Sequence, residues 1–162
     1  MKQVADTEIS EVVNLILSDY EDDRTINKID ISNQPDKEAI IDVVEKMMKV
    51  LFPGYYSDRV YKIFSLKNNM SATVEDIIYH LNKQIMIVLK YVNNENVVDE
   101  QELEKQAMCI TLQFMRKIPK IREVLETDVE AGFEGDPAAG SRDEIILSYP
   151  GMYAISVYRL AH

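Results

Sequence analysis

Asp136 is the residue whose type and setting most favour a role in binding. It precedes Pro137 in a short loop bounded by Gly135 and Gly140, where the backbone is restricted and a carboxylate can point outward. Such a carboxylate could hold a substrate ammonium group through a charge-assisted hydrogen bond. The alternative is that Asp136 only caps its own turn, and residue type by itself favours this alternative.

The two histidines, His80 and His162, are the other candidates for chemistry. Asp76 precedes His80 by one helical turn, so a carboxylate–histidine contact is geometrically possible. The simpler interpretation is that Asp76 serves a helix start and His80 lies at the edge of the core, because no third catalytic partner is apparent nearby. His162 has no acidic residue at helical spacing. We therefore expect no catalytic residue in this chain.

Metal and cofactor sites are not expected in this chain. One cysteine, Cys109, and two distant histidines cannot furnish a zinc cluster. Glycine motifs that bind phosphate groups are missing from the sequence. The single cysteine also rules out an intrachain disulfide and favours a reducing cytoplasm.

The elements that must position Asp136 are predicted to be helices. The 162 residues include only five Gly and five Pro, too few turn residues for a sheet-rich fold. Apolar residues recur three and four positions apart, as on one face of a helix. We expect an all-α bundle of about six main helices, with apolar stripes within 9–20, 40–52, 74–92, 103–129 and 150–161.

Local signals predict where these helices begin and end. Pro35 suits the first turn of one helix, together with Asp36 and Glu38, and Pro53-Gly54 ends it. Thr73 and Asp76 have the spacing of a capping box, which predicts a helix start. Weaker patterns predict a short extended piece at Ile26, Ile29 and Ile31, and a short helix after Asp58 with Val60, Tyr61 and Phe64 inward.

The second half of the chain carries its own signals. Asp99 and Glu102 again predict a helix start. Pro119 is expected to break or kink the helix that follows, and glycines end it before the Asp136 loop. Ser141 or Asp143 can cap a short helix, and Pro150 can start the last one, where Ala154, Ile155, Tyr158 and Ala161 share a face.

Charge and hydropathy narrow the setting and the partners. The formal net charge of −10 would repel phosphate backbones, so nucleic acid is not an expected partner. The chain starts without the apolar region of a signal peptide, and no apolar run approaches the roughly 18 residues of a membrane span. We expect a cytoplasmic protein without membrane contact. Because the last stripe continues to His162 without a stop signal, we expect the sequence to be truncated.

Two segments together resemble one protein family. Residues 128–139 contain Asp-Pro-Ala at 136–138, and residues 148–162 contain Tyr-Pro-Gly at 149–151 and Tyr-Arg-Leu-Ala-His at 158–162. Their order and spacing resemble the stretch that precedes the catalytic domain of serine O-acetyltransferases. Leu-Phe-Pro-Gly at 51–54 and Ile-Pro-Lys-Ile-Arg at 118–122 also resemble the branch with a long helical N-terminus.

The resemblance implies a specific activity for the parent protein. The family transfers an acetyl group from acetyl-CoA to the L-serine hydroxyl, giving O-acetylserine for cysteine biosynthesis, and L-cysteine commonly inhibits at the serine site. The general base and the CoA site belong to a left-handed β-helix of hexapeptide repeats, and this sequence contains no such repeat. The resemblance therefore implies an inactive fragment that binds no cofactor, in which Asp136 would contact the amino group of serine or cysteine.

The resemblance also suggests how the chain is organised. Residues 1–134 would form a helical oligomerisation region, and residues 135–162 would form the Asp-Pro-Ala loop and a connecting helix to the catalytic domain. The family's N-terminal helices associate, so a trimer or hexamer is expected. The alternatives are a non-enzymatic assembly or regulatory module and an unrelated acidic bundle that binds a protein partner.

Overall fold

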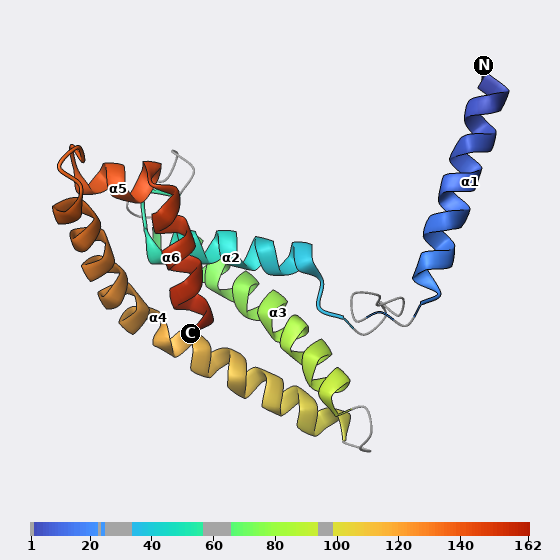
Figure 1. Ribbon diagram of the computed structural model, residues 1–162. Helices are drawn as coiled ribbons and strands as arrows, with labels where there is room; N and C mark the ends of the chain where they lie inside the picture. The colour runs from blue at the N-terminus through green and yellow to red at the C-terminus, as the bar shows by residue number, and fades with distance from the viewer. Residues whose placement is uncertain (1, 23, 25–33, 57–65, 94–98) are drawn as a thin grey trace. The chain divides into compact units, whose positions relative to one another are not determined.

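The fold is all-helical, as the sequence predicts. The computed structural model describes residues 2–22, 24, 34–56, 66–93 and 99–162, and within these ranges it has six helices and no strand (Figure 1). The chain divides into two units, Met1–Asn33 and Gln34–His162. The helices are α1 (Lys2–Tyr20), α2 (Lys37–Leu51), α3 (Leu66–Val92), α4 (Glu100–Gly135), α5 (Arg142–Ser148) and α6 (Pro150–Ala161).

The first unit contains α1, whose apolar side chains are exposed. Leu15 is 72% exposed, Ile9 61% and Ile16 45%. A helix that leaves such a stripe in water forgoes the burial that stabilises most protein helices. The predicted extended piece at residues 26–31 and the predicted helix after Asp58 lie outside the described residues. None of the described helices is long and apolar enough to span a membrane.

Helix α2 begins at an aspartate and ends at a glycine turn. Asp36 is the N-cap, and its carboxylate accepts from the amides of Glu38 (2.9 Å) and Ala39 (3.4 Å). The prediction that Pro35 lies in the first turn is wrong, because Asp36 takes the cap position and Pro35 precedes it. After the helix ends, Gly54 has a φ of 93°, a conformation that glycine adopts without a Cβ clash.

The predicted start of α3 at Thr73 and Asp76 is wrong. The helix already runs from Leu66, so both residues lie in its interior. No Gly or Pro separates Leu66 from Thr73, and a helix that has nucleated continues through such a stretch because each added residue gains one backbone hydrogen bond. Asp76 is therefore free to make tertiary contacts.

Helix α4 begins as predicted and continues through its proline. Asp99 is the N-cap and accepts from the Gln101 amide, and Pro119 lies inside the helix. Proline has no N–H to donate to the carbonyl four residues earlier, so it weakens the ladder there without ending it. Figure 1 shows α4 changing direction near its middle, which is where Pro119 lies.

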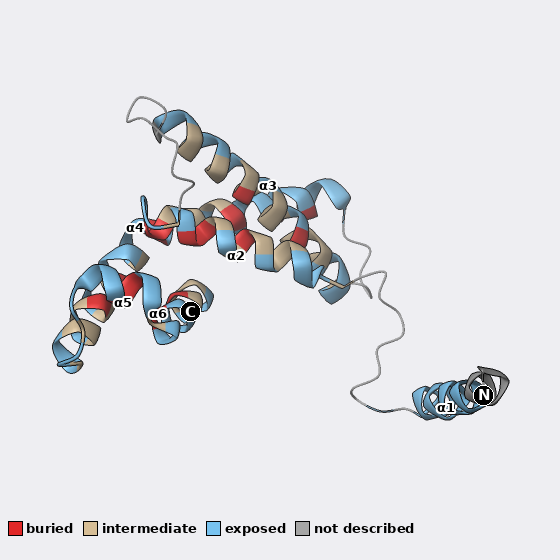
Figure 2. Ribbon diagram, turned by 90° about the horizontal axis from the view of Figure 1, so that it is seen from above, coloured by how far each residue is buried: buried red, intermediate tan, exposed pale blue. Residues whose placement is uncertain are grey.

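The core of the second unit lies where α2 packs against the later helices (Figure 2). Helix α3 packs against both α2 and α4, and α4 also packs against α5 and α6. Gly132 of α4 lets α5 approach, because a Cβ at this position would lie 3.2 Å from Cγ2 of Ile145. The buried core residues are Val43, Met47, Met48, Leu51, Phe52, Ile77, Ile118, Leu125, Val129, Ile145, Ile146 and Met152.

The last two helices start where the sequence predicts. Ser141 is the N-cap of α5, and its hydroxyl accepts from the Glu144 amide at 3.2 Å. Pro150 is the first residue of α6. This helix buries Met152 and Ser156, whereas the predicted apolar face of Ala154, Ile155, Tyr158 and Ala161 is exposed.

The core assignment can be tested with two matched leucine truncations. Leu125 is 1% exposed and Leu147 is 59% exposed. Leu125→Ala should lower the free energy of unfolding by about 2–5 kcal/mol, because it leaves a cavity between helices. Leu147→Ala should change it by less than about 0.5 kcal/mol. Urea denaturation of both variants is the measurement, and equal losses would contradict the packing described.

Candidate functional site

Asp136 lies at the junction of α4 and the loop that leads to α5. It is the C-cap residue of α4, and its Oδ1 accepts from the Ala138 amide at 2.9 Å. Its backbone carbonyl also accepts from the Ala139 amide at 3.0 Å. Asp136 therefore closes its own turn, the arrangement that the simpler interpretation of the sequence describes. This role uses Oδ1 and leaves Oδ2 for a contact with another part of the chain.

The second oxygen of Asp136 accepts a hydrogen bond from Tyr149. The Tyr149 hydroxyl lies 2.5 Å from Oδ2. This contact, with the Ala138 amide second, holds the pKa of the Asp136 carboxyl below its usual range. The same carboxylate raises the pKa of Tyr149 to about 12. At neutral pH the pair is therefore an ionised carboxylate that accepts from a protonated phenol.

The far end of the loop is held by α5. The Glu144 Oε2 accepts from the Gly140 amide at 2.8 Å, while the Glu144 amide donates to the Ser141 hydroxyl. This arrangement is related to a capping box, with the amide of the residue before the N-cap in place of the N-cap amide. The loop from Asp136 to Ser141 is therefore fixed at both ends by side chains.

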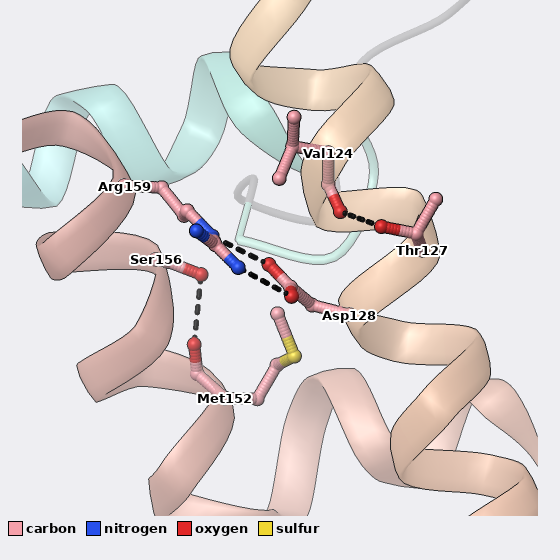
Figure 3. A network of polar contacts seen from close by, with 6 residues as sticks. All are labelled: Val124, Thr127, Asp128, Met152, Ser156 and Arg159. Atoms are coloured by element: carbon pink, nitrogen blue, oxygen red, sulfur yellow. Dashed lines mark hydrogen bonds and ion pairs between the residues drawn. The ribbon is translucent and has the colours of Figure 1, made fainter. Parts of the chain in front are cut away.

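A bidentate ion pair fastens α6 to α4. The Arg159 Nε and Nη2 atoms donate to the two Asp128 oxygens, each at 2.9 Å (Figure 3). The Asp128 side chain is 17% exposed, so the pair is partly shielded from water. The Asp128 hydrogen bond also raises the pKa of Arg159. Ser156, beside this pair, donates to the Met152 carbonyl of its own helix at 2.8 Å.

A second bidentate pair fastens α5 to α4. Arg142 donates to both Glu130 oxygens, each at 2.5 Å, and its guanidinium lies 4.6 Å from the centre of the Phe133 ring. The Arg142 hydrogen bonds lower the pKa of Glu130. Planar guanidinium groups favour this two-point geometry, which fixes orientation as well as distance. Helix α4 therefore carries one acidic anchor for each of the two helices that follow it.

The histidines lie away from this cluster. His80 Nε2 is 3.5 Å from Asp76 Oδ1, so the carboxylate–histidine contact that the spacing allows is present. Asp76 also pairs with Lys46 of α2, and the Lys46 hydrogen bond lowers the pKa of Asp76. The His162 ring stacks on the Tyr158 ring, with 4.3 Å between the two ring centres. Among the described contacts, none joins either histidine to Asp136.

A surface groove of about 570 Å³ lies between the end of α2, α4 and α5. Arg122, Glu126 and Tyr55 are among the residues that line it, whereas Asp136 is not. The Arg122 guanidinium donates to the Leu51 carbonyl at the end of α2. No residue of the loop 136–141 lines the groove, and one of its two arginines, Arg122, caps the end of α2.

Sequence reasoning selected Asp136 and missed the residues that fix its surroundings. Tyr149 and Arg159 lie in the second resembling segment, and Asp128 opens the first. Tyr149 contacts Asp136, 13 residues earlier, and Arg159 contacts Asp128, 31 residues earlier. The available signal was the presence of charged residues next to buried positions of α4 and α6, but that signal identifies no partner.

The chain is similar to proteins named serine acetyltransferase. A plasmid-encoded serine acetyltransferase of Synechococcus elongatus is 31% identical over 131 residues, which cover 79% of this chain and 41% of the relative. Shorter matches occur with serine acetyltransferases of Bacillus licheniformis (48% over 40 residues, 25% of this chain and 18% of the relative) and Bacillus subtilis (46% over 39 residues, 24% and 18%). No family model matches the chain.

These similarities identify the family that the sequence resembles. The described residues are helical and contain no strand, which is consistent with the helical N-terminal region of an acyltransferase. The chain is similar in sequence to proteins named serine acetyltransferase, over part of their length. It spans 41% of the length of the Synechococcus relative.

The two anchors of α4 can be separated by hydrogen exchange. Arg159→Gln removes the pair with Asp128, so the amides of α6 should exchange faster than those of α5. Arg142→Gln removes the pair with Glu130, so the amides of α5 should exchange faster than those of α6. Exchange measured by mass spectrometry on both variants tests this, and equal acceleration of both helices would show that the pairs do not act separately.

Proposed function

We propose that this chain is the helical part of a serine O-acetyltransferase. The observation that carries the proposal is the 31% identity over 79% of the chain with a relative of that name. The whole enzyme would transfer the acetyl group of acetyl-CoA to the L-serine hydroxyl, with the product used for cysteine biosynthesis in the cytoplasm. The serine oxygen attacks the thioester carbonyl, its proton passes to a general base, and CoA leaves as the thiol.

In this proposal the chain contributes substrate binding, and the catalytic part of the whole enzyme contributes the chemistry. Asp136 receives the ammonium group of L-serine, and of L-cysteine as the feedback inhibitor. The geometry of Asp136 supports this role, because its carboxylate is ionised and held in one orientation. The base and the acetyl-CoA site lie in the catalytic part, so the chain on its own should release no CoA above background.

The substrate role of Asp136 can be tested in the complete enzyme. Asp136→Asn keeps the size and removes the charge, so it should weaken serine binding and cysteine inhibition together by about ten- to a hundredfold. The KM for acetyl-CoA should stay near its original value. Steady-state kinetics in both substrates, run beside a thermal melt, are the measurement.

Asp143→Asn is the matched control for this test. Asp143 is an exposed acid of α5 that accepts from the Tyr55 hydroxyl at 2.6 Å, so its loss of charge should leave the serine constant unchanged. If Asp136→Asn lowers the melting temperature and leaves both the serine and cysteine constants unchanged, Asp136 only caps its turn and the substrate role is wrong.

A second proposed function is assembly through α1. Its exposed apolar stripe would be covered if copies of the chain associate, which supports self-association. The family resemblance suggests that the assembly is a trimer or hexamer. Self-association would also be the function of the chain under the alternative that it is a non-enzymatic assembly module. The length of α1 and its broad apolar face would suit packing against more than one helix.

Light scattering at micromolar concentration tests the assembly. The chain should have a mass of several copies, and Val13→Lys with Ile16→Lys should lower that mass. Asn14→Lys, which adds charge on the opposite face of α1, is the control and should leave the mass unchanged. A monomer of the unmodified chain across the accessible range would contradict the proposal.

A further inference from the structure

Tyr149 is fixed on both sides by the helices that it joins. It is the C-cap residue of α5 and the N-cap residue of α6, and Pro150 follows as the first residue of α6. Its ring is half-buried against the hydrophobic core. The side chain makes no capping hydrogen bond to α6. The hydroxyl is therefore carried at the end of a rigid, well-anchored ring and is not used by the helix that Tyr149 starts.

The hydroxyl instead reaches back across the loop to Asp136. It donates to Oδ2 at 2.5 Å, while Oδ1 accepts from the Ala138 amide at 2.9 Å. Each carboxylate oxygen thus has one donor, and an ionised carboxyl group offers about four acceptor positions in total. The two contacts fix the plane of the carboxylate and leave acceptor positions for a ligand.

The nature of the donor distinguishes Asp136 from the neighbouring acids. Asp128 and Glu130 are each paired with a guanidinium, which compensates their charge. Asp136 forms no ion pair with any residue in the described ranges, and both of its donors are neutral. A phenol orients a carboxylate without cancelling its charge, so the negative charge stays available to a cation.

We propose that Tyr149 is a positioning residue for Asp136, holding the carboxylate in the orientation that receives the ammonium group of an amino-acid substrate. This inference rests on the proposed function of Asp136. Tyr149 itself does not touch the substrate. It acts by removing rotational freedom from Asp136, so that less freedom is lost when the ligand binds. The raised pKa of Tyr149 and the lowered pKa of Asp136 are consistent with this contact.

The kinetic test uses Tyr149→Phe in the complete enzyme. This variant keeps the packed ring and removes the hydroxyl, so KM for serine and the cysteine inhibition constant should rise together by about three- to tenfold. The value of kcat and KM for acetyl-CoA should change by less than about twofold, because the thioester site is elsewhere. Tyr56→Phe is the matched control, since the Tyr56 hydroxyl donates to the Ile146 carbonyl of α5 and not to the loop.

A double-mutant cycle shows whether Tyr149 acts through Asp136. In the Asp136→Asn background, Tyr149→Phe should add no more than about a twofold change in KM for serine. The contact itself is tested without altering Tyr149, by labelling the tyrosines of this chain with ¹³C at Cζ. The Tyr149 signal, assigned with Tyr149→Phe, should titrate near pH 12, and in Asp136→Asn it should titrate closer to 10.

The outcomes separate the inference from the function on which it rests. If Asp136→Asn weakens serine binding and Tyr149→Phe does not, the positioning role is wrong and the substrate role of Asp136 stands. An equal effect of Tyr149→Phe in both backgrounds, or an unshifted Tyr149 titration in Asp136→Asn, also overturns the positioning role. If Asp136→Asn leaves serine binding unchanged, the proposed function fails and the inference fails with it.

Discussion

The bidentate ion pair between Asp128 and Arg159 determines where the last helix lies. Helix α6 buries only Met152 and Ser156 completely, so apolar burial alone fixes it weakly. The two parallel hydrogen bonds set both its distance from α4 and its rotation. Tyr149 starts this helix, and its hydroxyl meets Asp136. The orientation of a carboxylate in the loop thus depends on an ion pair at the other end of α6.

The same constraint explains why α4 must be continuous. The anchors Asp128 and Glu130 and the cap residue Asp136 all follow Pro119 along α4. If the helix broke at Pro119, the second half would lose its fixed register to the first half and would be held to α2 only by the Arg122 contact and core packing. The helix bends there without breaking (Figure 1), so the second half keeps its register. Ile118 and Leu125, on either side of the proline, join one core.

Helix ends were predictable from sequence where a side chain contacts its own backbone. Asp99, Ser141 and Pro150 act within four residues, so residue type and spacing suffice. The same reasoning was wrong at Thr73, because capping-box spacing also occurs inside a helix and only a breaker upstream would distinguish the two. The all-α fold was predictable because apolar periodicity reports burial on one face of a helix.

The candidate site was predictable only in part. Asp136 stood out because it lies between glycines and before a proline, and these are local properties. Its link to Tyr149 and the pairing of Asp128 with Arg159 depend on how α4 and α6 are rotated about their axes. Periodicity sets that rotation only within a wide range, as the exposed face of Ala154 and Tyr158 shows. The substrate role of Asp136 and the oligomeric state stay predictions.

The contact between Gly132 and Ile145 limits how this sequence can vary. A methyl group at position 132 would stand 3.2 Å from Cγ2 of Ile145, tighter than ordinary van der Waals contact. Ile145 lies on α5 next to Glu144, which holds the loop, and near Arg142, which fastens α5 to α4. A larger residue at 132 therefore needs Ile145 to shift or to be replaced by a smaller residue. In that sense the spacing of α4 and α5 constrains the combined size of two uncharged side chains, at positions 132 and 145.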